Sequence, residues 1–258
     1  MAIITLTSDW GTSDYYLAAV KGTILSQIPN AIIVDISHHI RQFDLEGAAF
    51  TVKNCYQSFP KGTIHIVSVN TEESIERPHI AISHNGYYFI GTDNGLFSMI
   101  LGDNVEDIVE IDIPQDTDFF TFSTRDRFVK AALKIMSGVP ISSLGEPREK
   151  LTSRLLFEPT ISSNSINGMV LHIDAYENAI TNIPFSLFKQ VRKGRAFEIH
   201  FAGYRLQKIQ TGYMDVGIAD LLSIFGTHGM LEIAMNQGRA ASLCGLERYT
   251  TVTIRFTD

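Results

Sequence analysis

The spacing of apolar residues changes at about residue 150, and this change constrains the fold more than any other feature. Before it, short β-branched runs alternate with segments that have apolar residues at helical spacing. The run 3–8 predicts a strand that ends in a turn at 9–12, and 13–28 predicts a helix with Ser13 as its N-cap. Because strands and helices alternate here, we expect a parallel sheet covered by helices.

The rest of the first half continues this alternation and then departs from it once. Further strands are predicted at 31–36 and 63–69, and a helix at 44–54 with Asp44 as its cap. The segment 79–91 is different, since an Asn-Gly pair between two apolar runs is typical of a tight β-hairpin. A last helix is predicted at 126–137.

Beyond about residue 145 the helical spacing fades. Prolines and a cluster of Ser and Asn predict a linker, and only short strands follow it, at 168–173, 195–201, 206–210, 230–235 and 250–256. Short strands without a long helix predict a small β-barrel or sandwich. We therefore predict a two-domain α+β fold. An α/β domain with a mainly parallel sheet occupies 1–150, a linker spans about 151–165, and a β-barrel-like domain occupies 166–258.

Composition narrows the class of protein. The net charge is −7 and basic residues form no block, which argues against a nucleic-acid partner. No apolar run approaches the length of a membrane span, and the first residues lack the pattern of a secretion signal. Cys55 and Cys244 lie far apart without a C-x-x-C pair, so we expect neither a zinc site nor a disulfide framework. These features predict a cytoplasmic protein with no membrane partner.

Five polar segments carry the candidate chemistry. In the first, 8–14, Asp9 follows the first strand, where open α/β sheets place ligands. Its carboxylate could accept both hydroxyls of a ribose, although an aspartate capping the next helix explains it equally well. The segment 121–126 precedes a helix and suits an anion or a polar ligand, but helix capping explains most such sequences. The other three segments are 91–96, 174–183 and 236–243.

Each segment is weak alone, but their order and spacing are specific. The chain resembles the S-adenosyl-L-methionine (SAM) hydrolases, also called SAM hydroxide adenosyltransferases, which are related to SAM-dependent fluorinases and chlorinases. The shared motifs are S-D-x-G-T-x-D at 8–14, D-N-G-L at 93–96, T-F-x-x-R-D at 121–126, D-x-x-x-N-x-x-T-N-I at 174–183 and N-x-G-x-A-A at 236–241. The resemblance implies a homotrimer in which SAM lies between the N-terminal domain of one subunit and the C-terminal domain of the next.

The resemblance also implies roles for individual residues. Asp9 would hold the ribose hydroxyls, and Phe43 would pack against the ligand. Asp174 and Asn178 would face the methionine amine and the adenine edge, while the turn at 227–228 would contact the methionine carboxylate. The implied substrate-binding residues are Asp9, Asp14, Phe43, Asp93, Asn94, Asp174, Asn178, Thr227 and His228.

The residues around the attacking water depart from the family pattern. Hydrolytic members use an Asp, an Arg and a His there. In this chain Asn70 replaces the Asp, Arg77 keeps the Arg at the family's offset, and Ser123 replaces the His. Asn70 can position a water but cannot take its proton. Thr124 falls where the halogenases place a hydroxyl residue that helps to hold halide.

Three functions therefore stay open. The first is hydrolysis of SAM to adenosine and L-methionine, and the second is a catalytically impaired protein that binds SAM or adenosine. The third uses halide or another small anion, because Arg77 lacks a carboxylate partner unless Glu72, Glu73 or Glu76 supplies one. We expect no metal and no cofactor beyond SAM as substrate. The pair His38-His39 has no carboxylates at ligand spacing, which favours a structural role.

Overall fold

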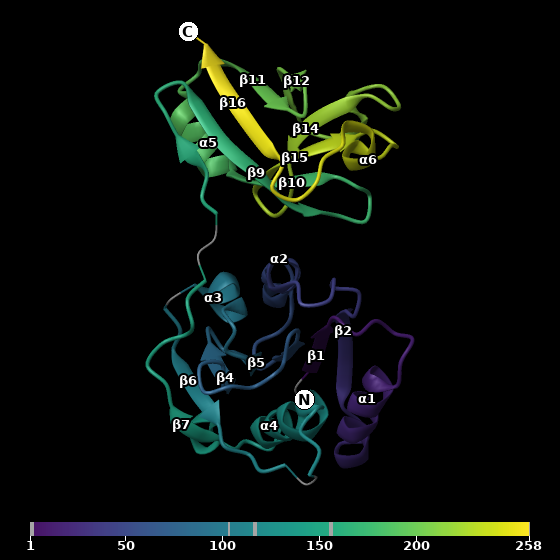
Figure 1. Ribbon diagram of the computed structural model, residues 1–258, viewed down its shortest axis with the longest axis vertical. Coiled ribbons are helices and arrows are strands. Elements are labelled where there is room, and N and C mark those ends of the chain that lie inside the picture. Colours follow the sequence, from purple (N-terminus) through teal and green to yellow (C-terminus); the bar gives the residue numbers. More distant parts are fainter. Residues whose placement is uncertain (1–2, 103, 116–117, 155–156, 258) are drawn as a thin grey trace. The chain divides into compact units, whose positions relative to one another are not determined.

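The computed structural model describes residues 3–102, 104–115, 118–154 and 157–257. The chain forms two compact units, Met1–Leu155 and Leu156–Asp258. Figure 1 shows that the first unit combines a sheet with helices, whereas strands dominate the second. We call them the sheet unit and the barrel-like unit.

The sheet unit has a mixed sheet, so the prediction of a mainly parallel one is wrong. Its order is β2-β1-β3-β5-β4-β6-β7, in which β2, β1, β3 and β5 are parallel and the remaining pairs are antiparallel. The hairpin turn at Asn85-Gly86, with φ of 50° and 78°, sends the chain back along itself, as predicted. The strands are β1 (Ile3–Ser8), β2 (Ile32–Ser37), β3 (Ile64–Ser68), β4 (His79–His84), β5 (Tyr87–Thr92), β6 (Asp107–Ile111) and β7 (Gly145–Pro147).

Helices cover both faces of this sheet and bury two apolar cores (Figure 1). The helices α1 (Tyr16–Gln27) and α4 (Val129–Met136) pack on one face, and α2 (Leu45–Lys53) and α3 (Leu96–Leu101) pack on the other. A π-helical turn, Thr124–Phe128, leads into α4, and short 3-10 turns occur at Tyr56–Ser58 and Ile141–Ser143.

The two predicted helix caps have different outcomes. Asp44 caps α2 as predicted, because its side chain accepts a hydrogen bond from the Gly47 N–H at 3.0 Å. The Ser13 prediction is wrong, since α1 begins later and has Tyr15 at its N-cap without a side-chain bond. The segment after β1 therefore runs on as a loop before the helix starts.

The barrel-like unit contains a nearly closed sheet of order β12-β11-β16-β9-β10-β15-β14-β13, with β8 paired to β9. β12 contacts β14 across the open seam, and apolar side chains fill the interior. The strands are β8 (Thr160–Ile161), β9 (Ser165–Ile173), β10 (Ala179–Pro184), β11 (Ala196–Phe201), β12 (Tyr204–Leu206), β13 (Ile209–Gln210), β14 (Leu221–Phe225), β15 (Met230–Met235) and β16 (Thr251–Thr257).

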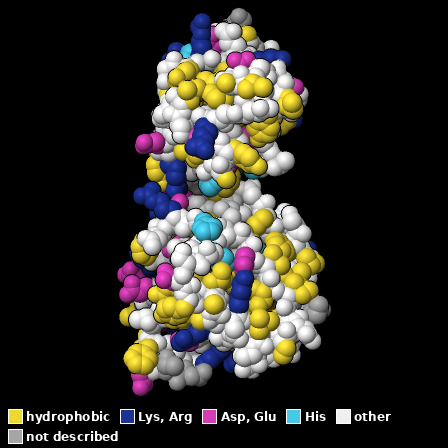
Figure 2. Space-filling view, turned by 90° about the vertical axis from the view of Figure 1, so that its right-hand side faces the viewer, with side chains coloured by type: hydrophobic (Ala, Val, Ile, Leu, Met, Phe, Trp, Pro, Cys, Tyr) yellow, Lys and Arg dark blue, Asp and Glu magenta, His cyan; other side chains and the backbone are white. Residues whose placement is uncertain are grey.

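Short helices complete this unit: α5 (Phe185–Arg192), α6 (Ala240–Cys244) and a 3-10 turn at Tyr213–Asp215. Within the segment predicted as a linker, about 151–165, the short strand β8 forms, and β9 begins at Ser165. On the face drawn in Figure 2, acidic and basic side chains both occur in each unit, with apolar ones between them. No described helix has the length and apolar character needed to cross a membrane.

Candidate functional site

The sheet unit contains a cavity of about 670 Å³, which we call the first cavity. Because β1, β2 and β3 are parallel, their carboxyl ends meet at one edge of the sheet. The loops after these strands line the cavity together with the segment that precedes the π-helical turn. Each contributes polar groups: Asp9 and Asp14 after β1, Gln42 after β2, Asn70 and Glu72 after β3, and Ser123 before the turn.

Asp9 and Phe43 form one unit at this cavity. The Asp9 Oδ2 accepts a hydrogen bond from the Phe43 N–H at 2.9 Å, and the Phe43 ring is 71% exposed. Phe43 has a φ of 63°, a left-handed conformation that is unfavourable for a bulky side chain, so the contact with Asp9 holds a strained loop. The alternative in which Asp9 caps the next helix does not hold, since α1 has no side-chain cap.

Aromatic rings form much of the wall. Trp10 lies 5.9 Å from Tyr16 and 5.7 Å from Phe122 between ring centroids, and Tyr16 lies 5.2 Å from Phe122. All three rings border the first cavity. They offer π faces, which attract cations and flat rings.

The loop after β3 carries Asn70 in a left-handed conformation, with φ of 52°. The Asn94 side chain donates hydrogen bonds to the carbonyls of Val69 and Asn70, each at 3.1 Å. Asn94 thus holds this loop in place. Ser123 shares the first cavity with Asn70, which brings two of the predicted catalytic residues together.

The other two predicted catalytic residues lie elsewhere. Thr124 is buried and donates to the Ser68 Oγ at 2.9 Å, so its hydroxyl is bonded to the end of β3. Arg77 is exposed in a turn whose backbone pairs with Ser74, and it is absent from the residues that border the first cavity. Within the sheet unit, Arg77 therefore does not join Asn70 and Ser123 at the first cavity.

A different arginine is partly buried near this loop. Arg127 pairs with Glu73, lies 3.0 Å from the His79 Nδ1 and donates to the Ile111 carbonyl at 2.8 Å. The His79 Nε2 lies 2.9 Å from the Thr71 carbonyl, and burial lowers the pKa of His79, which favours the neutral ring. Arg127 then donates to Nδ1 while Nε2–H donates to Thr71. None of the sequence motifs includes Arg127, although it directly follows the T-F-x-x-R-D segment.

Asp93 does not border the first cavity and is bonded to other protein groups. Its side chain is 1% exposed, accepts hydrogen bonds from the Thr152 N–H and hydroxyl, and lies 3.0 Å from the Arg148 guanidinium. This arrangement ties the end of β5 to the segment after β7. A structural role therefore explains Asp93 better than the predicted contact with substrate.

The charges around the first cavity favour a cationic ligand. Among the described residues that border it, Asp9, Asp14 and Glu72 are acidic and none is Lys, Arg or His. Carboxylates at short range stabilise a positive charge and oppose a negative one. The aromatic wall adds to this preference.

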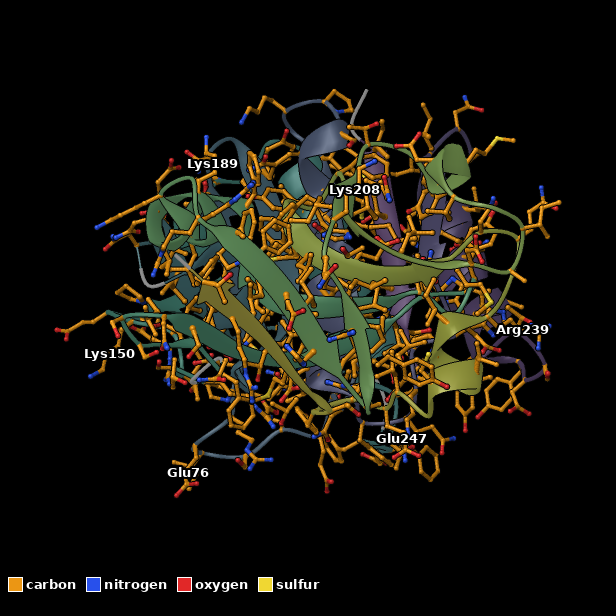
Figure 3. The ribbon with its side chains drawn as sticks, turned by 90° about the horizontal axis from the view of Figure 1, so that it is seen from above. Glu76, Lys150, Lys189, Lys208, Arg239 and Glu247 are labelled. Atoms are coloured by element: carbon orange, nitrogen blue, oxygen red, sulfur yellow. The ribbon has the colours of Figure 1, made fainter. Side chains whose placement is uncertain are left out.

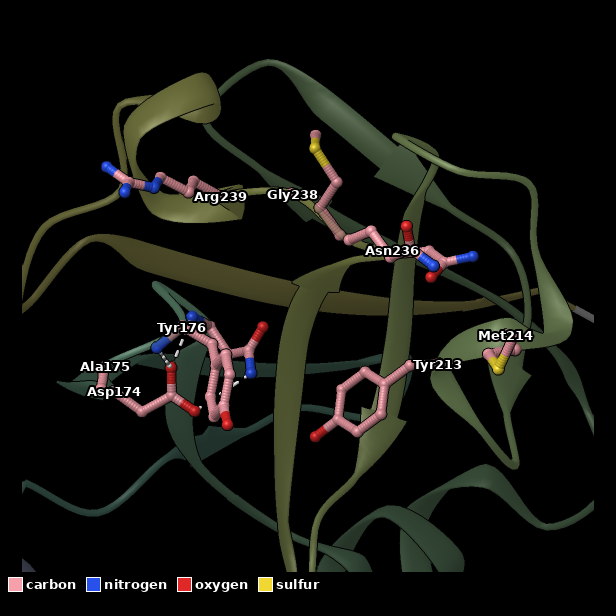
Figure 4. Close-up of a pocket in the computed structure, with 11 residues that line it drawn as sticks. Asp174, Ala175, Tyr176, Tyr213, Met214, Asn236, Gly238 and Arg239 are labelled. Atoms are coloured by element: carbon pink, nitrogen blue, oxygen red, sulfur yellow. Dashed lines mark hydrogen bonds between the residues drawn. The ribbon is translucent and has the colours of Figure 1, made fainter.

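The barrel-like unit has a second cavity of about 800 Å³, where two of the sequence motifs meet (Figure 4). Asp174 and Asn178 come from the loop between β9 and β10, and the segment 236–239 follows β15. The Asp174 carboxylate accepts hydrogen bonds from the N–H groups of Tyr176 and Asn178 and from the Asn178 amide, at 2.8 to 3.0 Å. Asp174 thus fixes the loop that carries it.

Glu177 connects the two motifs. Its carbonyl accepts the Ala241 N–H at 2.9 Å, and its carboxylate accepts the Ser242 N–H at 3.1 Å. The hydrogen bonds with Ser242 also lower the pKa of Glu177. Since these N–H groups belong to the first turn of α6, the loop of one motif caps the helix of the other.

Thr227 and His228 form the turn between β14 and β15. The His228 Nδ1 accepts the Met230 N–H at 3.1 Å, and its Nε2 lies 3.3 Å from the Glu232 carboxylate. Glu232 is only 3% exposed and also accepts a hydrogen bond of 2.8 Å from the Tyr213 hydroxyl. Both ring nitrogens of His228 have protein partners, so the predicted direct contact with a carboxylate fits Thr227, which is exposed, better than His228.

Sequence reasoning missed Tyr213, which borders the second cavity. Burial, followed by the bond to Glu232, raises the pKa of the Tyr213 hydroxyl. No local pattern marks Tyr213, because its partner lies on β15. Figure 4 shows its ring at the cavity beside the Asp174 loop.

Among the described residues, no group of three or more His, Cys, Asp or Glu side chains is arranged so that it could hold a metal ion. His38 contacts the Ser8 hydroxyl at 2.7 Å and lies 3.2 Å from Asp35, without the alignment of a hydrogen bond to the carboxylate. The backbone of His38 also contacts the loop that carries Asp9, because its carbonyl accepts a hydrogen bond from the Gly11 N–H at 2.7 Å. This supports the structural reading of His38.

Comparisons with known proteins match both units. The family model of the SAM hydroxide adenosyltransferase N-terminal domain matches residues 4–145, and the model of the C-terminal domain matches 168–253. An (R)-S-adenosyl-L-methionine hydrolase of Methanocaldococcus jannaschii is 33% identical over 70% of this chain and 66% of its own length. One of Thermus thermophilus is 27% identical over 96% and 97%, and a fluorinase of Actinoplanes is 22% identical over 98% and 97%.

A solved structure has the same fold. An uncharacterized conserved protein from Thermotoga maritima superposes with a TM-score of 0.88 at 25% identity, covering 98% of this chain and all of that one. Both units thus match domains of one SAM-dependent family. The chain belongs to the SAM hydroxide adenosyltransferase family.

Proposed function

We propose that this protein hydrolyses SAM to adenosine and L-methionine by displacement at the 5′ carbon. The observation that carries the proposal is the first cavity, where three carboxylates and several aromatic rings meet at the carboxyl ends of parallel strands. SAM carries a positive sulfonium and a ribose with two vicinal hydroxyls. A carboxylate such as Asp9 can accept both hydroxyls, and the remaining negative charge suits the sulfonium.

The chemistry needs little acid catalysis. Water attacks the 5′ carbon as the carbon–sulfur bond breaks, and the electron pair of that bond neutralises the sulfonium. Methionine leaves as a neutral thioether and needs no proton. Asp9 and Phe43 would orient the ribose, while Asn70 and Ser123 can hydrogen bond to the attacking water.

The barrel-like unit supports recognition of the rest of the ligand. In this proposal Asp174 binds the methionine amine, Asn178 the adenine edge and Thr227 the methionine carboxylate. The second cavity has the polar groups and the volume for such a ligand. We further propose a cytoplasmic homotrimer that needs no cofactor beyond SAM and completes each site with motifs from two subunits. Cys55 and Cys244 are both free, which agrees with a reducing compartment.

Two other functions have some support. Asn70 and Ser123 cannot take a proton at neutral pH, which supports an impaired protein that only binds SAM or adenosine. A halide nucleophile has less support, because no basic side chain among the described residues borders the first cavity. Arg77, on which that alternative rests, is exposed.

One incubation separates the three functions. Purified protein is mixed with SAM in buffers with and without chloride or fluoride, and the nucleosides are separated by chromatography. We expect adenosine at the same rate in every buffer. A 5′-halogenated nucleoside would favour the halide function, and tight binding of SAM by calorimetry without any nucleoside product would favour the impaired one.

A further inference from the structure

We propose that Glu72 is the general base that takes the proton from the attacking water. This assignment rests on the proposed hydrolysis. It starts from the loop after β3, which carries three glutamates within five residues, Glu72, Glu73 and Glu76. The structure separates these three side chains by what each one contacts.

Glu73 and Glu76 are placed for other roles. Glu73 pairs with Arg127, and one of its carboxylate oxygens lies 3.5 Å from the His79 ring, so it is bound to the body of the sheet unit. Glu76 belongs to the exposed turn between Ser74 and Arg77. Figure 3 shows Glu76 at the periphery of its unit, pointing outward.

Glu72 has neither kind of partner. No hydrogen bond or ion pair joins its carboxylate to the part of the chain that the structure describes, and Glu72 is among the residues that border the first cavity. The backbone before it is held in place, because Asn94 donates to the Asn70 carbonyl and the His79 ring lies 2.9 Å from the Thr71 carbonyl. The next side chain, Glu73, pairs with Arg127. These contacts place Glu72 at the edge of the cavity, where its exposed side chain is open both to the cavity and to solvent.

The groups beside Glu72 suit a bound water. Asn70, Thr71 and Ser123 border the same cavity and can donate or accept hydrogen bonds, but none of them takes a proton readily at neutral pH. The other two carboxylates come from the loop after β1. Asp9 is bonded to the Phe43 N–H, and Asp14 lies next to the start of α1. Glu72 is thus the carboxylate on the strand end that carries Asn70.

The step balances without another reactant. The water oxygen forms a bond to the 5′ carbon, the carbon–sulfur bond breaks, and its electron pair stays on sulfur. One water proton moves to the Glu72 carboxylate, and the other remains on the new 5′ hydroxyl of adenosine. Glu72 then releases its proton to solvent, so the overall products are adenosine, methionine and one proton.

The test compares Glu72→Gln with Glu76→Gln, which removes the same charge from the same loop outside the cavity. Calorimetry with SAM first establishes that each variant is folded and binds. For Glu72→Gln we expect kcat for adenosine to fall by about 100-fold or more with KM unchanged, whereas Glu76→Gln should match wild type. Glu72→Asp supplies the second readout, because it keeps a carboxylate at the same position. It should retain more of the wild-type kcat than Glu72→Gln, at the same affinity for SAM.

The outcomes separate this assignment from the proposed function. Wild-type turnover with an equally fast Glu72→Gln variant would overturn the role of Glu72 alone. Equal loss of kcat in Glu72→Asp and Glu72→Gln, with affinity for SAM also lost in both, would also overturn it, since Glu72 would then contribute to binding and not to proton transfer. A wild-type protein that binds SAM but never forms adenosine would overturn the proposed hydrolysis and the Glu72 assignment with it.

Discussion

The cavity of the sheet unit leaves two of its three carboxylates without a protein partner among the described residues, whereas polar side chains of the cavity in the barrel-like unit have protein partners. Within the described residues, Asp14 and Glu72 make no hydrogen bond or ion pair. In the second cavity, by contrast, Asp174 accepts three hydrogen bonds and Tyr213 donates to a buried glutamate. Open carboxylates can bind or deprotonate a ligand, while bonded ones hold a fixed shape.

This difference indicates a division between chemistry and recognition. A group that takes a proton must reach its substrate, so it cannot be saturated by protein donors. A group that recognises a ligand gains from a rigid setting, because less conformational freedom is lost on binding. Variants of the first cavity should therefore change ligand binding or turnover with little change in stability. Variants of the second should change both.

The largest effect that we predict in this comparison is on the stability of the sheet unit in acid. His65 is fully buried on β3, contacts the Thr5 hydroxyl at 2.7 Å, and burial lowers its pKa from 6.5 to about 4. Between these values the unfolded chain binds a proton that the folded chain does not. The contribution of neutral His65 to the free energy of unfolding is therefore complete above pH 6.5. The free energy of unfolding falls by about 3 kcal/mol as the pH drops to about 4.

Urea unfolding at pH 7.5 and pH 4.5 measures this loss in wild type and in His65→Leu. The variant lacks the titrating ring, so its free energy of unfolding should depend less on pH, whatever its absolute stability. An identical pH dependence in the two proteins would remove His65 as the source. The acid sensitivity would then belong to other groups, of which His79 is the first candidate, because it is also buried in the sheet unit and burial lowers its pKa.

Local sequence patterns predicted much of the fold. The strand after residue 2, the Asn85-Gly86 hairpin and the Asp44 cap depend on neighbouring residues, and the structure confirms all three. Beyond that hairpin, the antiparallel pairing was not predictable in this way, because β6 pairs with β4 only in the folded chain. The Ser13 cap failed because the polar loop after β1 is longer than its pattern suggested.

The candidate sites show the same limit. The motifs located the loops around both cavities, since their polar residues are adjacent in sequence. Arg127 and Tyr213 were missed because their partners, Glu73 and Glu232, are distant in sequence. The position of Arg77 outside the first cavity was likewise not visible, because exposure depends on how the loop folds back.

The next effect in size concerns the affinity of the first cavity for its ligand. Asp9→Ala removes the acceptor that we assign to the ribose hydroxyls, and a hydrogen bond to a charged group contributes about 1.5–3 kcal/mol. The Kd for SAM or adenosine should rise by about 10-fold to 100-fold. Stability should change little, because the only protein donor that Asp9 engages among the described residues is the exposed Phe43 N–H.

Calorimetry gives the affinity, and urea unfolding gives the stability. Glu146→Ala is the control, since Glu146 is an exposed carboxylate on β7 that does not border the first cavity. Equal affinity in Asp9→Ala and wild type would remove Asp9 from the site. A large loss of stability would instead show that Asp9 acts as a structural residue of its loop, which would weaken the contrast between the two cavities.

The smallest effect tests whether stability and binding are coupled in the second cavity. Tyr213→Phe removes one hydroxyl and leaves the buried Glu232 with His228 as its remaining partner in the Tyr213–Glu232–His228 set. Losing a hydrogen bond to a buried carboxylate should lower the free energy of unfolding by about 1 kcal/mol or slightly more.

Tyr176→Phe is a matched control on the same cavity, because Tyr176 is 78% exposed and its hydroxyl has no partner among the described residues. We expect Tyr213→Phe to lose affinity for SAM along with stability, since the Glu232 network would no longer fix the ring, whereas Tyr176→Phe should keep its stability. If Tyr213→Phe unfolds at the same urea concentration as Tyr176→Phe, the bond to Glu232 contributes nothing to the fold, and the rigidity argued for the second cavity rests on the Asp174 loop alone.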